Sequence, residues 1–408
     1  MAATRTKGAV LAFVVAAAFS GPQWSASDAE AVVSRPSAPS GRTVASTTGF
    51  AQGHTILWVS DDQLARDLDG MVRAGAGWLR LDFDWPSIQS GGRDRWNWGP
   101  TDRVVAAAAA RGLSILAVPA YTPDWARPAG TNGHHPPTDP ADYARFVAAA
   151  AERYAPRGVH HWEIWNEPNL DDFWQPAPDP VAYTELLVAA SAAIHGVDRT
   201  ATVMNGGLAP ASDIFGDALA PRTFLMMMYA AGAGPAIDAV AMHPYSFPYA
   251  PMLRADWNAF STLPETHALM ARFGDGRKPI WATESGFGTG SDEHSVNETV
   301  QALRIRQLVD AWYEFDFTGN LFLYTYRDLS ATSSMAFERM GLVRADGSSK
   351  PAFRVFQQAV EQPAFEREVQ RGLCGPAAHL APAGNDHCVE TRRVARFVRS
   401  RVLAALGS

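Results

Sequence analysis

The sequence has little lysine, little cysteine and few long apolar runs, and each scarcity argues against a class of protein. Lysine occurs three times among the 35 Lys and Arg residues, the arginines are scattered among acidic residues, and the formal net charge is -7. A basic surface that binds nucleic acid is therefore not expected. The two cysteines, Cys374 and Cys388, do not have the spacing of a zinc or redox motif. They could close a small loop or remain as two free thiols.

The apolar run at residues 8–19 stands near the N-terminus, behind Arg5 and Lys7, and small residues follow it at 25–31. This order is typical of a secretory signal peptide, so we expect residues 1–31 to be removed and the protein to be secreted or kept in the cell envelope. A run of about 12 residues is too short for a spanning helix, which needs roughly 20. No later stretch is expected to span a membrane, so stable membrane insertion is not predicted.

The rest of the sequence alternates short apolar runs with longer stretches of helical spacing. Residues 32–47 are rich in Ser, Pro and Arg and are expected to form a disordered linker. The alternation that follows is typical of βαβ units. The expected strands are residues 48–52, 78–83, 114–119, 159–165, 201–206, 237–243, 279–284 and 321–326. With a last helix at residues 351–360, this count over residues 48–362 predicts an α/β fold, a (β/α)8 TIM barrel, rather than an open doubly wound sheet.

Four of the expected helices have recognisable starts. Ser60 and Ser295 are each followed three residues later by Gln or Glu, which fits a capping box. Asp139 and Asp179 each precede a proline, which fits an N-cap followed by proline in the first helical position. Residues 363–408 hold the cysteine pair and an Arg-rich amphipathic stretch, and we expect them to form a short C-terminal helical extension packed against the barrel.

Polar residues that end the expected strands are the candidate site residues, because a barrel of this kind carries its chemistry at the C-terminal ends of its strands. They are, in strand order, Arg80, Asp82, Asn166, Glu167, Asn205, His243, Tyr245, Glu284, Tyr324, Tyr326 and Arg327. Glu167 and Glu284 then stand on opposite sides of one barrel mouth. Two carboxyl groups about 5 to 5.5 Å apart, one to attack and one to protonate, are what retaining glycoside hydrolysis requires. Arg80 could keep the attacking carboxylate ionised by pairing with it.

Several stretches together resemble the clan A glycoside hydrolases, and most of all the bacterial members of glycoside hydrolase family 39. The stretches are WEIWNEPN, WATESGFG, MHPY and the arginine of the second strand. The resemblance extends over about residues 48–360. It implies that Glu167 is the general acid/base and that Glu284 is the nucleophile.

The same resemblance implies roles for four further residues. Asn166 would hold the sugar 2-hydroxyl and Arg80 would support the nucleophile, while His243 and Tyr245 would line the nucleophile's side of the site. Other interpretations stay open from the residues alone. Arg80 could form a structural ion pair with the nearby Asp82, and His243 could be a satisfied core histidine. Neither a metal nor a cofactor is expected, since the neighbouring histidine pairs on strands point to opposite faces and lack an acidic partner.

Aromatic residues are frequent in the expected loops after the strands. They are Trp85, Tyr121, Trp125, Phe173, Trp174, Phe247, Tyr249 and Trp257. Such rings suit the apolar faces of pyranose sugars, or they anchor long loops. Trp125 and Tyr324 are counted among the expected sugar contacts, and Asn205 is either another such contact or a turn residue before Gly206. Tyr324 also marks a departure, because many clan members place a tryptophan on the eighth strand as the floor of the central sugar site.

We therefore predict a secreted retaining glycoside hydrolase that cuts a polysaccharide or oligosaccharide, with endo action and as a monomer. Exo action, as in a xylosidase or arabinofuranosidase, is the first alternative. Family 39 xylosidases usually carry an extra β-sandwich, for which the tail here is too short, so the chain looks more like compact members that act on bacterial polysaccharides. A barrel that binds glycan without cutting it is the second alternative, and the two intact carboxylates argue against it.

Overall fold

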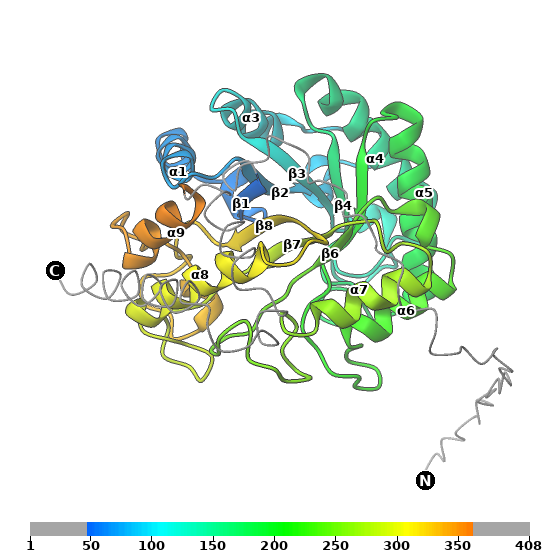
Figure 1. Ribbon diagram of the computed structural model, residues 1–408. Coiled ribbons are helices and arrows are strands. Elements are labelled where there is room, and N and C mark those ends of the chain that lie inside the picture. Colours follow the sequence, from blue (N-terminus) through cyan, green and yellow to red (C-terminus); the bar gives the residue numbers. More distant parts are fainter. Residues whose placement is uncertain (1–46, 362–408) are drawn as a thin grey trace, which may run out of the picture. The chain divides into compact units, whose positions relative to one another are not determined.

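Eight parallel β-strands form the inner wall of a barrel in the computed structural model, which describes residues 47–361 (Figure 1). The strands are β1 (Thr48–Ala51), β2 (Trp78–Asp84), β3 (Ser114–Ala120), β4 (His161–Ile164), β5 (Thr202–Asn205), β6 (Val240–Met242), β7 (Ile280–Ser285) and β8 (Thr318–Tyr324). They pair in the order β5-β4-β3-β2-β1-β8-β7-β6. The predicted (β/α)8 fold is confirmed. The predicted signal peptide, the linker before residue 47 and the extension at 363–408 lie outside the described residues.

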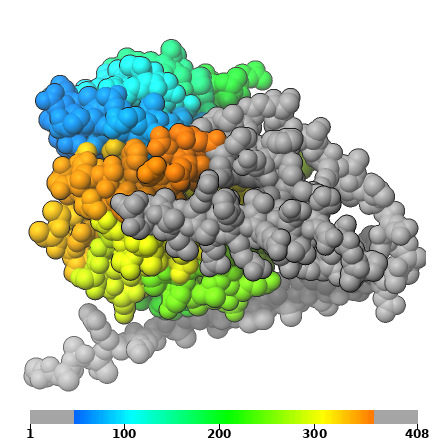
Figure 2. Space-filling view, turned by 60° about the vertical axis from the view of Figure 1, so that its left-hand side comes forward, coloured from blue at the N-terminus to red at the C-terminus, as the bar shows by residue number. Residues whose placement is uncertain are grey.

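Helices surround the strands on the outside of the barrel (Figure 1). The main ones are α1 (Asp61–Arg73), α3 (Gly99–Ala109), α4 (Pro140–Tyr154), α5 (Pro180–Val197), α6 (Pro221–Ala230), α7 (Leu263–Arg272), α8 (Glu298–Trp312) and α9 (Pro351–Glu361), with a short α2 (Trp85–Ile88) directly after β2. Figure 2 shows the orange C-terminal segment between the blue α1 and the yellow α8. The side chain of Gln357 on α9 donates to the carbonyl of Arg73 at the end of α1, 3.0 Å away. The last helix thus closes the ring of helices where it began.

Three of the four predicted helix starts are confirmed. Ser60, Asp139 and Asp179 each accept a hydrogen bond from a backbone N–H in the first turn of α1, α4 and α5. The prediction for Ser295 is wrong, because α8 begins later and its N-cap is Asn297. The hydroxyl of Ser295 donates to an aspartate in the preceding loop instead. Asn is as good an N-cap as Ser, so the choice between them depends on where the loop delivers the chain.

Helix α5 is long and apolar enough to cross a membrane by length and composition, contrary to the expectation that no stretch after the N-terminus would be. It is a helix of the barrel wall that packs between α4 and α6. Leu186, Leu187, Ala190 and Ile194 are almost fully buried on its inner face. Packing therefore explains the apolar inner face of α5, whereas Val181 and Val188 on its outer face are exposed.

The lower part of the barrel interior is filled by rings. Trp78 lies edge-on to Trp281 and Phe322, with ring centroids 5.6 and 6.2 Å apart, and His161 completes the group beside Trp78. Burial, together with the charge of the neighbouring His160, lowers the pKa of His161 to about 4, so this imidazole is neutral at pH 7. The interior is thus a packed apolar plug, and polar groups gather above it at the C-terminal ends of the strands.

Asn205 closes the seam of the barrel between β5 and β6. These two strands share only isolated bridges rather than a continuous ladder. The side-chain nitrogen of Asn205 donates to the carbonyl of Ala241 at 3.0 Å, and its side-chain oxygen accepts from the N–H of the same residue at 3.1 Å. The amide of Asn205 thereby supplies the hydrogen bonds that a neighbouring strand would otherwise make.

Candidate active site

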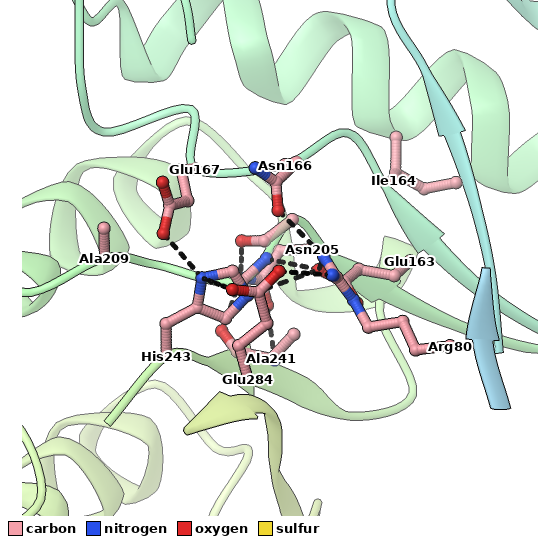
Figure 3. A network of polar contacts seen from close by, with 12 residues as sticks. Arg80, Glu163, Ile164, Asn166, Glu167, Asn205, Ala209, Ala241, His243 and Glu284 are labelled. Atoms are coloured by element: carbon pink, nitrogen blue, oxygen red, sulfur yellow. Dashed lines mark hydrogen bonds and ion pairs between the residues drawn. The ribbon is translucent and has the colours of Figure 1, made fainter. Parts of the chain in front are cut away.

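The C-terminal ends of four strands bring most of the predicted site residues together at the barrel mouth (Figure 3). These residues are Arg80 on β2, Asn166 and Glu167 after β4, His243 and Tyr245 after β6, and Glu284 on β7. In Figure 3 the side chains of Glu167, His243, Glu284 and Arg80 point toward one another and form a connected network of polar contacts. These residues were predicted from the sequence because the C-terminal ends of parallel barrel strands lie at the same face of the barrel.

Arg80 is the centre of the network. Its side chain is almost fully buried, and Nε and Nη2 bind the two oxygens of Glu163 at 2.7 and 2.8 Å. Nη1 donates to Oε1 of Glu284 at 2.6 Å, and Nη2 also donates to Oδ1 of Asn166 at 2.8 Å. Arg80 makes no hydrogen bond to Asp82, so the alternative of a structural pair with that residue is wrong. Burial alone would lower the pKa of Arg80, but the charges of Glu163 and Glu284 raise it, so the guanidinium stays charged.

Glu163 is a site residue that the strand-end rule missed. It lies within β4, is fully buried, and accepts from the N–H of Gly207 at 2.8 Å in addition to Arg80. A carboxylate inside an apolar strand is expensive to bury without a partner. That cost is the signal in the sequence that could have identified Glu163, although the sequence does not say that the partner is 83 residues away.

Glu284 is held as a carboxylate. Oε1 accepts from Arg80, and Oε2 accepts from the hydroxyl of Tyr245 at 2.8 Å. Burial would raise the pKa of Glu284, but the charges of His243 and Arg80 and the hydrogen bonds from Tyr245 and Arg80 lower it below its usual value. Glu284 is therefore ionised at neutral pH and has electron pairs available for attack.

Glu167 stands beside Glu284, with His243 next to both. Nδ1 of His243 lies 2.7 Å from Oε1 of Glu167 and 3.9 Å from Oε2 of Glu284. One atom of each of the three side chains lies within 4.8 Å of the others. Burial would lower the pKa of His243, but the charge of Glu284 and the hydrogen bond with Glu167 raise it. The spacing of the two carboxyl groups fits retaining rather than inverting hydrolysis, which requires 6.5 to 9.5 Å.

The turn after β4 aims Glu167 into the mouth through an unusual backbone. Trp165 has φ 73° and Glu167 has φ 46°, both in the left-handed region. Such a conformation costs on the order of 1 kcal/mol or more for a residue with a side chain, and it persists only where the surroundings enforce it. The N–H of Glu167 donates to the carbonyl of Gly207 at 3.2 Å, which fixes the turn against the end of β5. The strained backbone is consistent with a need to orient the Glu167 carboxyl group toward the barrel mouth.

Asn166 and Tyr121 form the side of the mouth next to Arg80. The oxygen of the Asn166 side chain is occupied by Arg80, and its nitrogen donates to the hydroxyl of Tyr121 at 3.2 Å. The ring of Tyr121 lies 5.2 Å from that of the buried Trp165. Burial and the charges of Asp82 and Glu167 raise the pKa of Tyr121, so its hydroxyl keeps its proton.

The remaining predicted sugar contacts have different surroundings. Asn205 has no exposed atom, and its amide is used at the barrel seam, which favours the structural alternative over a sugar contact. Tyr324 is half-buried, and burial, with the charge of Glu284 adding to it, raises the pKa of its hydroxyl. Trp125 is half-buried, donates its indole N–H to the carbonyl of Gln89 at 2.9 Å, and has the guanidinium of Arg93 over its ring, 5.5 Å from the ring centroid.

The loop aromatics divide into buried anchors and accessible rings. Trp85 and Trp174 are almost fully buried and anchor their loops. Tyr249 and Trp257 are each half exposed, at 50%. Phe247 packs against Tyr245, with ring centroids 5.2 Å apart.

Glu167, His243 and Glu284 each offer an atom that could bind a metal ion. Both oxygens of Glu284, however, already accept hydrogen bonds, and the guanidinium of Arg80 lies 2.6 Å from one of them. A cation would have to compete with that positive charge. The cluster is therefore better suited to proton transfer and nucleophilic attack than to metal binding, and the absence of a metal stays a prediction.

Comparisons with known proteins bear on the identity of this site. The family model described as Cellulase (glycosyl hydrolase family 5) matches residues 22–319. A search of curated proteins found no match. Among solved structures, a family 39 glycoside hydrolase from the gut symbiont Bacteroides cellulosilyticus WH2 is 21% identical with a TM-score of 0.63, over 78% of this chain and 64% of that one. The chain thus spans somewhat less than two thirds of that protein's length.

Two other solved structures are similar. A monomeric beta-xylosidase from Caulobacter crescentus CB15 is 17% identical with a TM-score of 0.62, over 78% of this chain and 68% of that one. A GH5_18 enzyme from Streptomyces cattleya in complex with Manb1-4GlcNAc is 19% identical with a TM-score of 0.59, over 78% and 82%. At these identities the structures show the shared fold, and the family model, which matches well over half of the chain, shows the family. The chain belongs to the cellulase family, glycosyl hydrolase family 5, and shares its fold with family 39 glycoside hydrolases.

Proposed function

We propose that this protein is an exported glycosidase, that it cuts within a glycan chain, and that it works by double displacement with retention of configuration. The observation that carries the mechanism is the pair of carboxyl groups, Glu167 and Glu284, with oxygens within 4.8 Å of each other. Their surroundings differ in the way the two roles require. Glu284 is stabilised as an anion by Arg80 and Tyr245, whereas the side chain of Glu167 shares a hydrogen bond with His243 alone among residues 47–361.

In the first step, Glu284 attacks the anomeric carbon while the bond to the leaving oxygen breaks. Glu167 gives its proton to that oxygen, and a covalent glycosyl-enzyme forms on Glu284. In the second step, the Glu167 carboxylate takes a proton from water, and the water oxygen attacks the anomeric carbon and releases Glu284. Each step inverts the carbon once, so the product keeps the configuration of the substrate.

Tyr245→Phe is expected to move the acidic limb of the kcat/KM profile to higher pH. Glu284 acts as a carboxylate, and its pKa lies below the usual value, so activity is present above that pKa and is lost as the pH falls through it. Removing the hydroxyl that donates to Oε2 removes one of the causes of the low pKa. The measurement is kcat/KM for an activated aryl glycoside from pH 3 to 8.

The matched control for that profile is Tyr121→Phe. It also removes a phenolic hydroxyl from the mouth, but this hydroxyl contacts Asn166 and makes no hydrogen bond to Glu284. Its acidic limb should stay where that of the wild type is. If the limb of Tyr245→Phe also stays in place, the acidic limb does not report Glu284.

Endo action is supported by two accessible rings on the loop after β6. Tyr249 and Trp257 are half exposed, and their centroids lie 5.2 Å apart. The fully buried Asn258 fixes this loop, because its side-chain nitrogen donates to the carbonyls of Pro251 and Leu253 at 3.0 and 2.7 Å. The same loop begins at His243 and Tyr245 in the site. Rings held there suit the apolar faces of sugars that lie beyond the cleaved bond.

Trp257→Ala should therefore lower kcat/KM for a long glycan by about tenfold, the size of one stacking contact. It should leave hydrolysis of a small aryl glycoside within about twofold, because that substrate is too short to extend from Glu284 to Trp257. Phe273→Ala is the control, since Phe273 is a half-exposed ring at the end of α7, stacked on Tyr229, at the opposite end of the barrel. Equal losses on both substrates would argue against a subsite at Trp257.

Exo action is kept as the alternative because similar structures include a beta-xylosidase and an exo-beta-1,4-mannosidase. Product size separates the two modes. An endo-acting enzyme shortens a polymer quickly and leaves oligosaccharides, whereas an exo-acting one releases monosaccharide from the start. Xylosides, mannosides and glucosides are the first aryl glycosides to assay, because the similar structures include a beta-xylosidase, an exo-beta-1,4-mannosidase and a glucosidase.

Export is proposed from the signal-like sequence at residues 1–31. Expression with the native N-terminus, followed by N-terminal sequencing of the protein outside the membrane, tests it. A carbohydrate partner follows from the family, and we propose that the enzyme acts as a monomer and needs no cofactor.

The proposed function is tested by hydrolysis of a panel of aryl glycosides, with the anomeric configuration of the first product followed by proton NMR. We expect at least one glycoside to be hydrolysed with retention. A first product of inverted configuration would contradict the double displacement, and a protein that binds glycans but cleaves none would contradict the enzyme assignment.

A further inference from the structure

Asp82 is a charged group at the barrel mouth that the mechanism above does not use. It lies on β2 two residues after Arg80, and alternate residues of a strand share a face, so both point into the barrel. The intervening Leu81 and the following Phe83 are fully buried on the other face, against the helices. Asp82 is only half-buried, so its carboxylate is reachable from the mouth.

No residue between 47 and 361 donates a hydrogen bond to Asp82. Arg80, its nearest cationic neighbour on the strand, directs its N–H groups to Glu163, Glu284 and Asn166. Asp84, the next residue on the same face, accepts from the hydroxyl of a serine in α2. Arg80, Asp82 and Asp84 share one face of β2, and Asp82 is the one whose carboxylate oxygens have no hydrogen-bond donor within residues 47–361. These oxygens can therefore accept hydrogen bonds from a ligand.

The surroundings of Asp82 leave room for such a partner. Gly53, after β1, has φ 58°, and a Cβ placed on it would meet nothing within 4 Å except Oδ2 of Asp82, at 3.6 Å. Burial raises the pKa of the Tyr121 and Tyr324 hydroxyls, and the charge of Asp82 adds to the rise for both. Burial raises the pKa of Asp82 itself to about 6, because the charges of Arg80 and His54 offset it only in part and Glu284 and Asp84 add to it.

We propose that Asp82 is a specificity-determining residue that accepts hydrogen bonds from ring hydroxyls of the sugar attacked by Glu284. An ionised carboxylate has lone pairs for several donors and cannot donate. Left without donors in a half-buried site, it is poorly solvated, and sugar hydroxyls would supply what the protein does not. The ligand class follows: a sugar with free hydroxyls on the side of β2, rather than one that is deoxygenated or substituted there.

This inference rests on the proposed function, and its test begins with the glycoside that the wild type hydrolyses. For that substrate, Asp82→Asn should lower kcat/KM by about 10- to 100-fold, the range for hydrogen bonds to a charged group. Asp124→Asn, which removes an exposed carboxylate from the loop after β3 at the same end of the barrel, should stay within about twofold. Thermal melting of both variants checks that they are folded, and Asp82→Ser replaces Asp82→Asn if the latter is not.

The decisive readout is a set of monodeoxy versions of the same aryl glycoside. With wild type, the glycosides that lack a hydroxyl bound by Asp82 should be hydrolysed about 10- to 100-fold more slowly than the parent. With Asp82→Asn, the same deoxygenation should cost less than about threefold, while deoxygenation elsewhere should cost both proteins equally. This double-mutant cycle distinguishes a direct hydrogen bond between Asp82 and a sugar hydroxyl from a general loss of structure in the variant.

Equal penalties for every deoxy glycoside in both proteins would overturn the role of Asp82 while leaving the glycosidase intact. A wild type that hydrolyses no glycoside would instead remove the proposed function, and the role of Asp82 with it.

Discussion

Replacing Glu284 by alanine should lower kcat/KM for an activated aryl glycoside by about 100,000-fold, the order of loss seen when a covalent nucleophile is removed. Glu284 is the carboxylate that forms the bond to the anomeric carbon. Arg80 and Tyr245, which hold it ionised, cannot take its place because neither offers an anionic oxygen. The measurement is steady-state hydrolysis of a dinitrophenyl glycoside, followed by its absorbance.

Glu167→Ala is the matched comparison, because it removes the other carboxylate of the pair. A dinitrophenolate leaves without needing a proton, so this variant should still form the glycosyl-enzyme rapidly and then accumulate it. Added azide should rescue both variants with different products. Glu284→Ala should give a glycosyl azide of inverted configuration, whereas Glu167→Ala should give one of retained configuration, since azide then replaces the second attack only.

Those configurations distinguish the two roles without relying on the size of the activity loss. If Glu284→Ala gives the retained azide and Glu167→Ala the inverted one, the roles of the two residues are reversed. If neither variant is impaired, the chemistry lies elsewhere in the chain.

Replacing Glu163 by alanine should destabilise the protein by about 3 to 5 kcal/mol, the usual cost of removing one partner of a buried ion pair. Arg80 would keep its charge in a site that is almost free of solvent, and the N–H of Gly207 would lose its acceptor. Thermal unfolding should show a melting temperature lower by about 5 to 15 °C. Activity should fall as well, because Arg80 would no longer be held against Glu284.

Two controls separate the charge from the volume of Glu163. Glu163→Gln keeps the shape and an oxygen that can accept from Gly207, so it should lose less stability than Glu163→Ala. Glu185→Ala removes an exposed glutamate from α5 and should change stability by no more than about 0.5 kcal/mol. A melting temperature for Glu163→Ala equal to that of Glu185→Ala would show that the buried pair contributes nothing to the fold.

The strand-end rule located the polar cluster because it needs only the position of each strand. Apolar runs of strand length, separated by helical stretches, predicted where eight strands end, and the polar residues there include Glu167 and Glu284. The barrel itself then brings together residues that are far apart in the sequence, such as Arg80 and Glu284. Predicting that these distant residues lie together required only the number and order of the strands.

The parts that the sequence did not reveal depend on pairs that only the three-dimensional arrangement selects. Glu163 sits inside an apolar strand, and its partner Arg80 is on another. From its residue type, Asn205 could bind a sugar or form a turn. In the structure its side-chain amide instead hydrogen-bonds the backbone of Ala241 on the neighbouring strand β6. Ser295 and Asn297 are both good caps, and the path of the loop decides between them.

The most direct test of the central claim is to incubate the wild type with the 2-fluoro analogue of its preferred aryl glycoside and to locate the label by mass spectrometry of peptides. The fluorine slows both steps, and the activated leaving group keeps the first step faster than the second, so the covalent intermediate accumulates. We predict one label, on Glu284, and none on the Glu284→Ala variant. A label on Glu167, Asp82 or any other residue, or steady turnover with inversion and without labelling, would contradict the assignment of Glu284 as the nucleophile of a retaining glycosidase.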